Sequence, residues 1–154
     1  MNDTSHSDAA LLVIGYGNTL RSDDAAGPLV ADRISALGLS GVQVITCQEL
    51  TPDLAAEITE AVTVVFVDAT ADAAREVVLR KLAPDLNCPV STHATDPRAL
   101  LALAQELYGH APTAWLLKVP AANFDHGEEL SEVTRRGIEA AVDKIRTLAA
   151  PVPA

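Results

Sequence analysis

The chain has 154 residues, enough for one domain with a proper hydrophobic core. Hydrophobic residues make up 49% of the chain, which is typical of a globular protein rather than a disordered one. Acidic residues outnumber basic ones by 21 to 11, giving a net charge of −10. This balance argues against nucleic acid and anionic membranes as partners, because both attract basic patches.

The N-terminal stretch 1–10 lacks the basic region and apolar core of a signal peptide, so we do not expect it to be one. Because the stretch is polar, we predict a disordered tail. No apolar run approaches the length of a membrane span. The two cysteines, Cys47 and Cys88, do not form a disulfide scaffold, and no basic residue near Cys47 in sequence would activate its thiol. We therefore expect a cytoplasmic protein with reduced thiols.

The stretch 11–27, LLVIGYGNTLRSDDAAG, organises the rest of the chain. Its apolar run Leu11–Ile14 is short and stopped by glycine, which indicates a strand buried on both faces. The glycines of Gly15–Asn18 favour a tight turn. A polar loop with Asp23 and Asp24 follows, and then a helical pattern begins. The stretch therefore predicts a strand, a glycine turn, an acidic loop and a helix.

Further along the chain, short apolar runs alternate with segments of helical periodicity and recognisable caps. Asp96 before proline and Ser131 are expected to begin helices, and Gly38 and Gly109 to end them. The expected strands are 42–46, 62–67, 76–82 and 114–119, and the expected helices are 28–37, 52–61, 97–107 and 131–148.

This alternation implies right-handed crossovers and a mostly parallel sheet with helices on both faces. We predict an α/β fold, a three-layer α/β/α sandwich with a twisted, mostly parallel sheet of five or six strands, of the phosphorylase/hydrolase-like kind. A single domain is expected over residues 11–149, followed by a loose tail at 150–154.

A dinucleotide-binding fingerprint is the obvious alternative for the glycine turn. That fingerprint needs a third glycine three residues after the second, and Leu20 stands there. Asp23 and Asp24 also place negative charge where a phosphate would lie, near the start of a helix that they themselves favour. The loop therefore suits a cation better than an anion.

Three residues distant in sequence share one trait. Asp24, Asp68 and His93 each follow an apolar run into an expected loop. In a parallel sheet, ligands bind at the carboxyl ends of strands where the winding direction reverses, and the loops after the first and third strands commonly flank that point. Two carboxylates and an imidazole form an open site for a divalent metal, suited about equally to nickel or zinc.

Each of these residues also has a structural interpretation. Asp23 or Asp24 could cap the following helix, and Asp68 could cap a turn at the end of its strand. A lone His93 is more often hydrogen-bonded within the structure than a metal ligand. The other histidines, in polar stretches, are expected to be solvated; they are His6, His110 and His126.

The residues resemble a known family, the maturation endopeptidases of nickel-iron hydrogenase large subunits. Its opening motif, Gly-x-Gly-Asn-x-Leu-x-x-Asp-Asp/Glu-x-x-Gly, is matched by Gly15–Gly27. Many members have glycine where this chain has Ser22 and Ala25. Later segments continue the resemblance over nearly the whole chain, at residues 48–54, 96–109, 114–117, 119–120 and 124–131.

The resemblance implies an endopeptidase, of aspartic type or dependent on the metal of its substrate. Its substrate and partner would be a hydrogenase large-subunit precursor, cut at its C-terminal extension after nickel insertion. The metal-contacting and catalytic residues of the family fall on Asp24, Asp68 and His93. No resident cofactor is implied, because the nickel arrives with the substrate, although other divalent metals can occupy the site.

Two questions remain open on the residues alone. The general base could be Asp24 or His93. The function could instead be that of a non-catalytic module that checks nickel and binds the precursor without cutting it. A nucleotide-binding α/β domain is the less favoured alternative.

Overall fold

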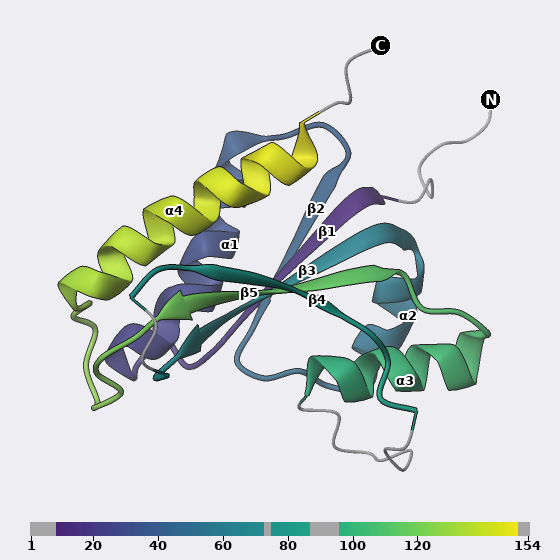
Figure 1. Ribbon diagram of the computed structural model, residues 1–154, viewed down its shortest axis with the longest axis horizontal. Helices are drawn as coiled ribbons and strands as arrows, with labels where there is room; N and C mark the ends of the chain where they lie inside the picture. The colour runs from purple at the N-terminus through teal and green to yellow at the C-terminus, as the bar shows by residue number, and fades with distance from the viewer. Residues whose placement is uncertain (1–8, 73–74, 87–95, 151–154) are drawn as a thin grey trace.

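The computed structural model describes residues 9–72, 75–86 and 96–150. Figure 1 shows a central twisted sheet between two layers of helices. No helix in these ranges is long and apolar enough to cross a bilayer. The elements in chain order are β1 (Ala9–Tyr16), a short 3-10 helix (Ser22–Ala25), α1 (Ala26–Leu37), β2 (Val42–Cys47), α2 (Leu54–Thr59), β3 (Ala61–Thr70), β4 (Val78–Leu82), α3 (Pro97–Tyr108), β5 (Thr113–Pro120) and α4 (Glu132–Ala149).

The described residues form one five-stranded sheet with the strand order β2-β1-β3-β5-β4. Four strands run parallel, and β4 pairs antiparallel with β5 at one edge. The chain passes from β1 to β2 on one side and returns to β3 on the other, so the winding direction reverses between β1 and β3. The predicted fold class is confirmed, and the reversal marks the place where such sheets bind ligands.

Helices cover both faces of the sheet: α1 and α4 lie on one face, and α2 and α3 on the other (Figure 1). The central strand β3 shows why its sequence is a continuous apolar run. Val65 and Val67 pack with α1 and α4, Val64 and Phe66 pack with α2 and α3, and all four are 0% exposed. A strand buried on both faces needs apolar side chains at every position.

The predicted helix caps are present. Asp96 accepts a hydrogen bond from the backbone N–H of Arg98, and Ser131 accepts one from that of Thr134. Gly38 and Gly109 end α1 and α3 in the left-handed conformation, at φ 61° and 83°. These local signals fix where α3 and α4 begin and where α1 and α3 end.

Several strand boundaries differ from those expected, including the following three. Ala9 and Ala10 belong to β1 rather than to the tail, because β1 already pairs with Ala61 of β3. The strand β4 begins at Val78 rather than at residue 76. The strand β3 does not stop at Asp68 but continues to Thr70, because β5 pairs with it that far. Asp68 is therefore a strand residue rather than a loop residue.

Glycines allow the start of α1 to lie directly on the sheet. A Cβ atom added to Gly15 of β1 would lie 2.1 Å from the carbonyl oxygen of Gly27. A Cβ atom added to Gly27 would lie 2.5 Å from the carbonyl oxygen of Val67 in β3. Both distances are far below van der Waals contact, so no side chain fits at either position. The glycine motif is therefore explained by helix–sheet packing, without any phosphate.

The carboxylate of Asp23 is fully buried, at 0% exposure, and accepts four hydrogen bonds. The backbone N–H groups of Ala122, Asn123 and Ser131 donate over 2.8, 2.9 and 2.8 Å, and the Ser131 hydroxyl over 2.7 Å. Burial alone would raise the pKa of Asp23, but these hydrogen bonds outweigh it and hold the pKa below its usual 3.8. Asp23 thus ties the loop after β1 to the segment between β5 and α4.

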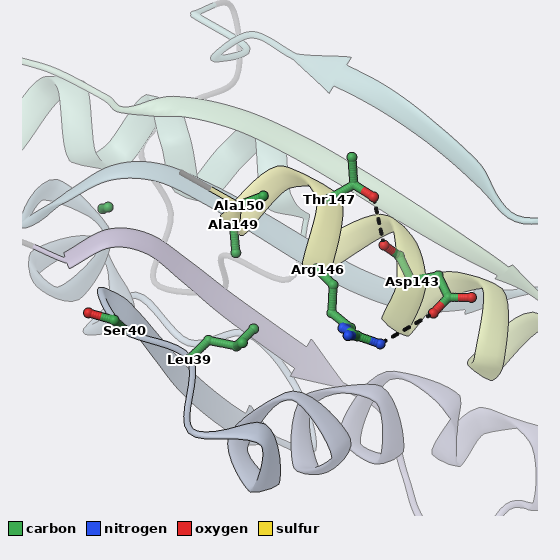
Figure 2. Close-up of a pocket in the computed structure, with 8 residues that line it drawn as sticks. Leu39, Ser40, Asp143, Arg146, Thr147, Ala149 and Ala150 are labelled. Carbon is green, nitrogen blue, oxygen red and sulfur yellow. Dashed lines mark hydrogen bonds and ion pairs between the residues drawn. The ribbon is translucent and has the colours of Figure 1, made fainter. Parts of the chain in front are cut away.

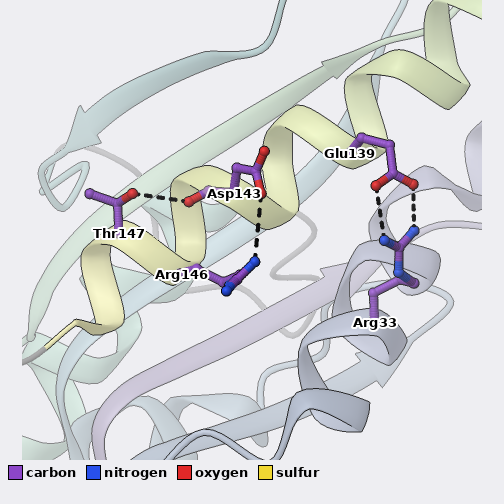
Figure 3. A network of polar contacts seen from close by, with 5 residues as sticks. All are labelled: Arg33, Glu139, Asp143, Arg146 and Thr147. Atoms are coloured by element: carbon purple, nitrogen blue, oxygen red, sulfur yellow. Dashed lines mark hydrogen bonds and ion pairs between the residues drawn. The ribbon is translucent and has the colours of Figure 1, made fainter.

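An exposed ion pair also links α1 to α4. Figure 3 shows Arg33 and Glu139 joined by two parallel hydrogen bonds of 2.8 and 3.0 Å. Farther along α4, Arg146 lies 3.9 Å from the Asp143 carboxylate, and the Thr147 hydroxyl donates to the Asp143 carbonyl. Water screens such exposed pairs, so the apolar side chains between the two helices stabilise their contact more than these charges do.

The substitution Asp23→Asn should destabilise the protein by about 2–4 kcal/mol, because an amide NH₂ would face hydrogen-bond donors in a buried site. The matched control is Asp32→Asn, at an exposed position of α1, which should change little. Urea unfolding of both variants and of the wild type measures the difference.

The pH dependence gives a second check. A lowered pKa stabilises the folded state above the unfolded value near 3.8, and this stabilisation is lost as pH falls through the lower folded value. The difference in the free energy of unfolding between wild type and Asp23→Asn should therefore become smaller at acidic pH. A difference that persists unchanged at low pH would contradict the charged state of Asp23.

Candidate active site

The turn after β1 closes tightly around Asp24. The backbone N–H of Asn18 donates to Asp24 Oδ2 over 2.7 Å, and the N–H of Gly17 donates to the Cys47 carbonyl over 3.1 Å. Gly17 has φ 149°, and a Cβ atom there would lie 2.1 Å from the Asp24 carbonyl oxygen. One oxygen of Asp24 is thus held by the turn, and the carboxylate remains only partly buried.

Two residues in this loop depart from the glycines that the family motif often carries. Ser22 is buried and has φ 52°, in the left-handed region that costs an L-residue about 1–2 kcal/mol. Its hydroxyl donates to the Asp125 carbonyl over 2.7 Å, which offsets part of that cost. Ala25 has an ordinary helical φ of −71° and does not need glycine. Among the two, only Ser22 adds strain to the loop.

Asp68 lies near the carboxyl end of β3, on the face covered by α2 and α3. The register of the sheet places Lys118 of β5 beside it on one side. Tyr16 of β1 lies on the other side, one residue beyond the paired Gly15 and Val67. The Tyr16 hydroxyl donates a hydrogen bond to the Asp68 carboxylate. Asp68 is therefore flanked by a phenol and an ammonium group in one row across the sheet.

The surroundings of Asp68 shift its titration toward neutral pH. Burial raises its pKa from 3.8 to about 6, and the nearby Asp24 carboxylate adds to this. The hydrogen bonds from Tyr16 and from the Ala69 N–H, and the charge of Lys118, act in the opposite direction. Burial and the charge of Asp68 also raise the pKa of Tyr16 well above its usual range, so its hydroxyl remains a donor.

The structure thus brings two of the three predicted site residues together. Asp24 and Asp68 meet where the winding of the sheet reverses, close enough for one charge to raise the pKa of the other. His93 lies outside the described residues. The chain is described again from Asp96, whose carboxylate is close enough to Tyr16 to raise its pKa. The roles of all three residues stay predictions.

The structural roles considered for the three acids, as caps of a helix or a turn, have a different outcome for each residue. Neither Asp23 nor Asp24 caps α1, whose N-terminus has no side-chain cap. Asp23 is buried and binds the segment between β5 and α4, as described above. Asp24 accepts a hydrogen bond from Asn18 in the glycine turn. Asp68 accepts a hydrogen bond from the next backbone N–H, that of Ala69, but also faces Asp24 and Tyr16.

Two adjacent, partly buried carboxylates can hold a cation or a positively polarised centre, because a cation relieves their repulsion. In the described ranges, no group of three or more histidine, cysteine, aspartate or glutamate side chains is placed to bind a metal ion. The predicted set of Asp24, Asp68 and His93 includes a residue outside those ranges, so the metal site stays a prediction.

Sequence reasoning did not find Tyr16 and Lys118 as neighbours of Asp68. Their signals were present: Tyr16 stands between two glycines at the end of a strand, and Lys118 is a lone charge within the apolar run of β5. Both belong to the site only because of strand register, which the sequence pattern alone does not determine.

The thiols and the other histidines do not form a second site in the described part of the chain. Cys47 ends β2 beside Tyr16, and burial, with the charge of Asp53, raises the pKa of its thiol, which is the opposite of activation. His110 and His126 are exposed, as expected. Cys88 and His6 lie outside the described residues.

A groove of about 850 Å³ lies at the opposite end of the sheet (Figure 2). Its walls come from Ala10 at the start of β1, from Leu39 and Ser40 before β2, and from the C-terminal turns of α4. In this class of sheet, ligands bind at the carboxyl ends of the strands, whereas this groove lies at the amino ends. The groove is therefore separate from the pair of acids.

No protein-family model matches the chain, and no curated protein matches it by sequence. Solved structures do. The nickel-iron hydrogenase maturation protease HycI from Thermococcus kodakarensis KOD1 is 27% identical, with a TM-score of 0.69 over 95% of this chain and 93% of that one.

Two further structures share the fold. The maturation protease HybD from Thermococcus kodakarensis is 23% identical, with a TM-score of 0.73 over 91% of this chain and 99% of that one. The hydrogenase maturating endopeptidase HybD from E. coli is 19% identical, with a TM-score of 0.66 over 90% of each chain. The resemblance of Gly15–Gly27 to nickel-iron hydrogenase maturation proteases is thus confirmed by the likeness to HycI, and the two HybD structures show the same fold.

Proposed function

We propose that this protein is an endopeptidase that removes the C-terminal extension of a nickel-iron hydrogenase large-subunit precursor after nickel has been inserted. The observation that carries the proposal is the pair of carboxylates, Asp24 and Asp68, at the reversal point of a sheet whose fold is shared with maturation proteases. The motif that surrounds Asp24 is the one on which the family resemblance rests.

In this proposal, nickel belongs to the substrate and is recognised by Asp24, Asp68 and His93. Carboxylate and imidazole ligands suit such a cation. The nickel polarises the carbonyl group of the scissile bond, as a Lewis acid. Water adds to the carbonyl carbon, the C–N bond breaks, and the leaving amine takes up a proton. Asp24 and His93 are the candidates for the base that takes the proton from water.

The raised pKa of Asp68 supports a site that binds a cation. Its carboxyl group is held close to Asp24 and loses its proton only near pH 6. An arriving cation favours the ionised form and relieves the repulsion between the two acids. Titratable groups that are shifted in this way by burial and by a specific neighbour cluster at functional sites.

A module that checks nickel and binds the precursor without cutting it would use the same residues. A cleavage assay separates the two functions, because such a module would hold the precursor at full length. A nucleotide-binding domain is disfavoured, since the glycines of the motif serve packing and the loop presents carboxylates.

The first test of the proposal is cleavage of a nickel-loaded precursor. Asp24→Asn, Asp68→Asn and His93→Ala should each slow cleavage at least about 100-fold, because each removes a group proposed to act on the nickel or on the water. Asp32→Asn, an exposed acid on α1, should cleave at the wild-type rate. Mass spectrometry of the large subunit measures the shortened product. Equal cleavage of nickel-free precursor would contradict nickel recognition.

The second test concerns stability. A raised pKa means that the folded state binds more protons than the unfolded state between about pH 4 and 6, so the charge of Asp68 destabilises the protein as pH rises through this window. Asp68→Asn should therefore raise the free energy of unfolding at pH 7.5 by about 1–2 kcal/mol, after allowing for partial exposure. No gain is expected at pH 4. Urea titrations at both pH values measure this difference. A lower stability of Asp68→Asn at pH 7.5 would show that burial and repulsion act less on Asp68 than its hydrogen bonds and the charge of Lys118 do.

The third test concerns metal. The isolated protein should carry little divalent metal when purified and should bind added Ni²⁺ or Cd²⁺ weakly, because the substrate must complete the ligand set. Binding should release protons, and affinity should fall as pH drops through about 6, where Asp68 takes up a proton. Metal analysis and calorimetry measure this. Stoichiometric zinc that resists chelators would contradict the substrate-metal mechanism.

A further inference from the structure

The backbone of Tyr16 is fixed from both sides. It is the last residue of β1, and the sheet register pairs it with Cys47 of β2. The preceding Gly15 lies against Gly27, and the N–H of the following Gly17 binds the Cys47 carbonyl. The Cα atom of Tyr16 therefore has little room to shift.

The side chain of Tyr16 is fixed as well. Its ring packs against the apolar cluster beneath α2 and α3, and a tyrosine has only two side-chain torsions, so the packed ring sets the position of the hydroxyl. That hydroxyl donates to Asp68. A phenylalanine would fill the same space with the same ring, so the packing does not require the hydroxyl group.

The neighbour on the other side of Asp68 acts differently. Lys118 is opposite Asp68 in the register, but its ammonium group binds the Asp72 carboxylate at 2.8 Å. Lys118 therefore acts on Asp68 through its charge. Among the described residues, the side-chain hydrogen bond that orients the Asp68 carboxylate comes from Tyr16.

The two acids are thus held in matching ways. The backbone N–H of Asn18 holds one oxygen of Asp24, and the Tyr16 hydroxyl binds the Asp68 carboxylate. A carboxylate offers two oxygens and about four acceptor positions. Asp24 therefore keeps acceptor capacity for a cation after its hydrogen bond from Asn18, and Asp68 after its hydrogen bonds from Tyr16 and the Ala69 N–H.

We propose that Tyr16 is a positioning residue whose hydroxyl orients the Asp68 carboxylate toward Asp24 and an incoming cation. The proposal rests on the proposed function for its link to precursor cleavage, whereas its link to cation binding concerns this chain alone. A hydrogen bond to a charged group is lost when the hydroxyl is removed, and the carboxylate can then adopt orientations that do not face Asp24.

Tyr16→Phe tests the proposal, with Tyr108→Phe as the matched control, because Tyr108 is 50% exposed at the end of α3. In Tyr16→Phe, the affinity of the isolated protein for Cd²⁺ should fall about tenfold, and kcat for nickel-loaded precursor should fall by a similar factor. The KM for the precursor should not change. Cd²⁺ should alter the near-ultraviolet tyrosine absorbance of wild type and Tyr108→Phe, but not of Tyr16→Phe.

Two outcomes would overturn the proposal, an unchanged Cd²⁺ affinity and an unchanged kcat. A raised KM together with the unchanged kcat would assign the hydroxyl to precursor binding. Cleavage rates are divided by the folded fraction of each variant, which circular dichroism measures. A variant that is only less stable is then not mistaken for one whose Asp68 carboxylate is misoriented. If wild type does not cut the precursor, the proposed function fails, and the Cd²⁺ titration alone then decides the role of Tyr16.

Discussion

The site depends on one buried carboxylate that does not belong to the proposed chemistry. Asp23 has no exposed surface and forms no ion pair with a basic side chain of the described residues, yet four neutral donors keep its pKa low. Because Asp24 follows directly, the anchoring of Asp23 sets the direction in which Asp24 points. Two consecutive acids thus serve different purposes: Asp23 is buried and holds the loop, whereas Asp24 lies near Asp68.

The second constraint is the close contact between helix and sheet at the glycines. Gly15 and Gly27 let the start of α1 touch the ends of β1 and β3, which leaves no space there for a phosphate. The positive end of α1 then faces a loop rich in carboxylates, and such charges are favourable near a helix N-terminus. In dinucleotide-binding proteins a glycine turn between a strand and a helix binds an anion. In this protein the glycine turn is closely packed and lies beside carboxylates.

The sequence predicted the parts of this fold that depend on local pattern. Buried apolar runs gave the strands, and Asp96, Ser131 and Gly109 gave helix ends. The meeting of Asp24 and Asp68 was also predictable, because the carboxyl ends of neighbouring parallel strands share one edge of the sheet.

The different roles of Asp23 and Asp24 were not predictable in this way, because they depend on donors about a hundred positions away in the chain. The extension of β3 past Asp68, and the neighbours Tyr16 and Lys118, depend on strand register. A one-residue slip in register moves every side chain to the other face, and apolar runs buried on both faces do not specify it.

The separation of 108 residues between Asp23 and Ser131 has a consequence for the order of assembly. A nascent chain can form β1, α1 and β3 early, but the donors for Asp23 follow β5 and are made much later. Until then, burying the Asp23 carboxylate would leave it without partners, at a cost of several kcal/mol. The loop that carries Asp24 therefore lacks its full set of anchoring hydrogen bonds until Ser131 has been made, so a chain truncated before that residue would contain the acids of the site without their arrangement.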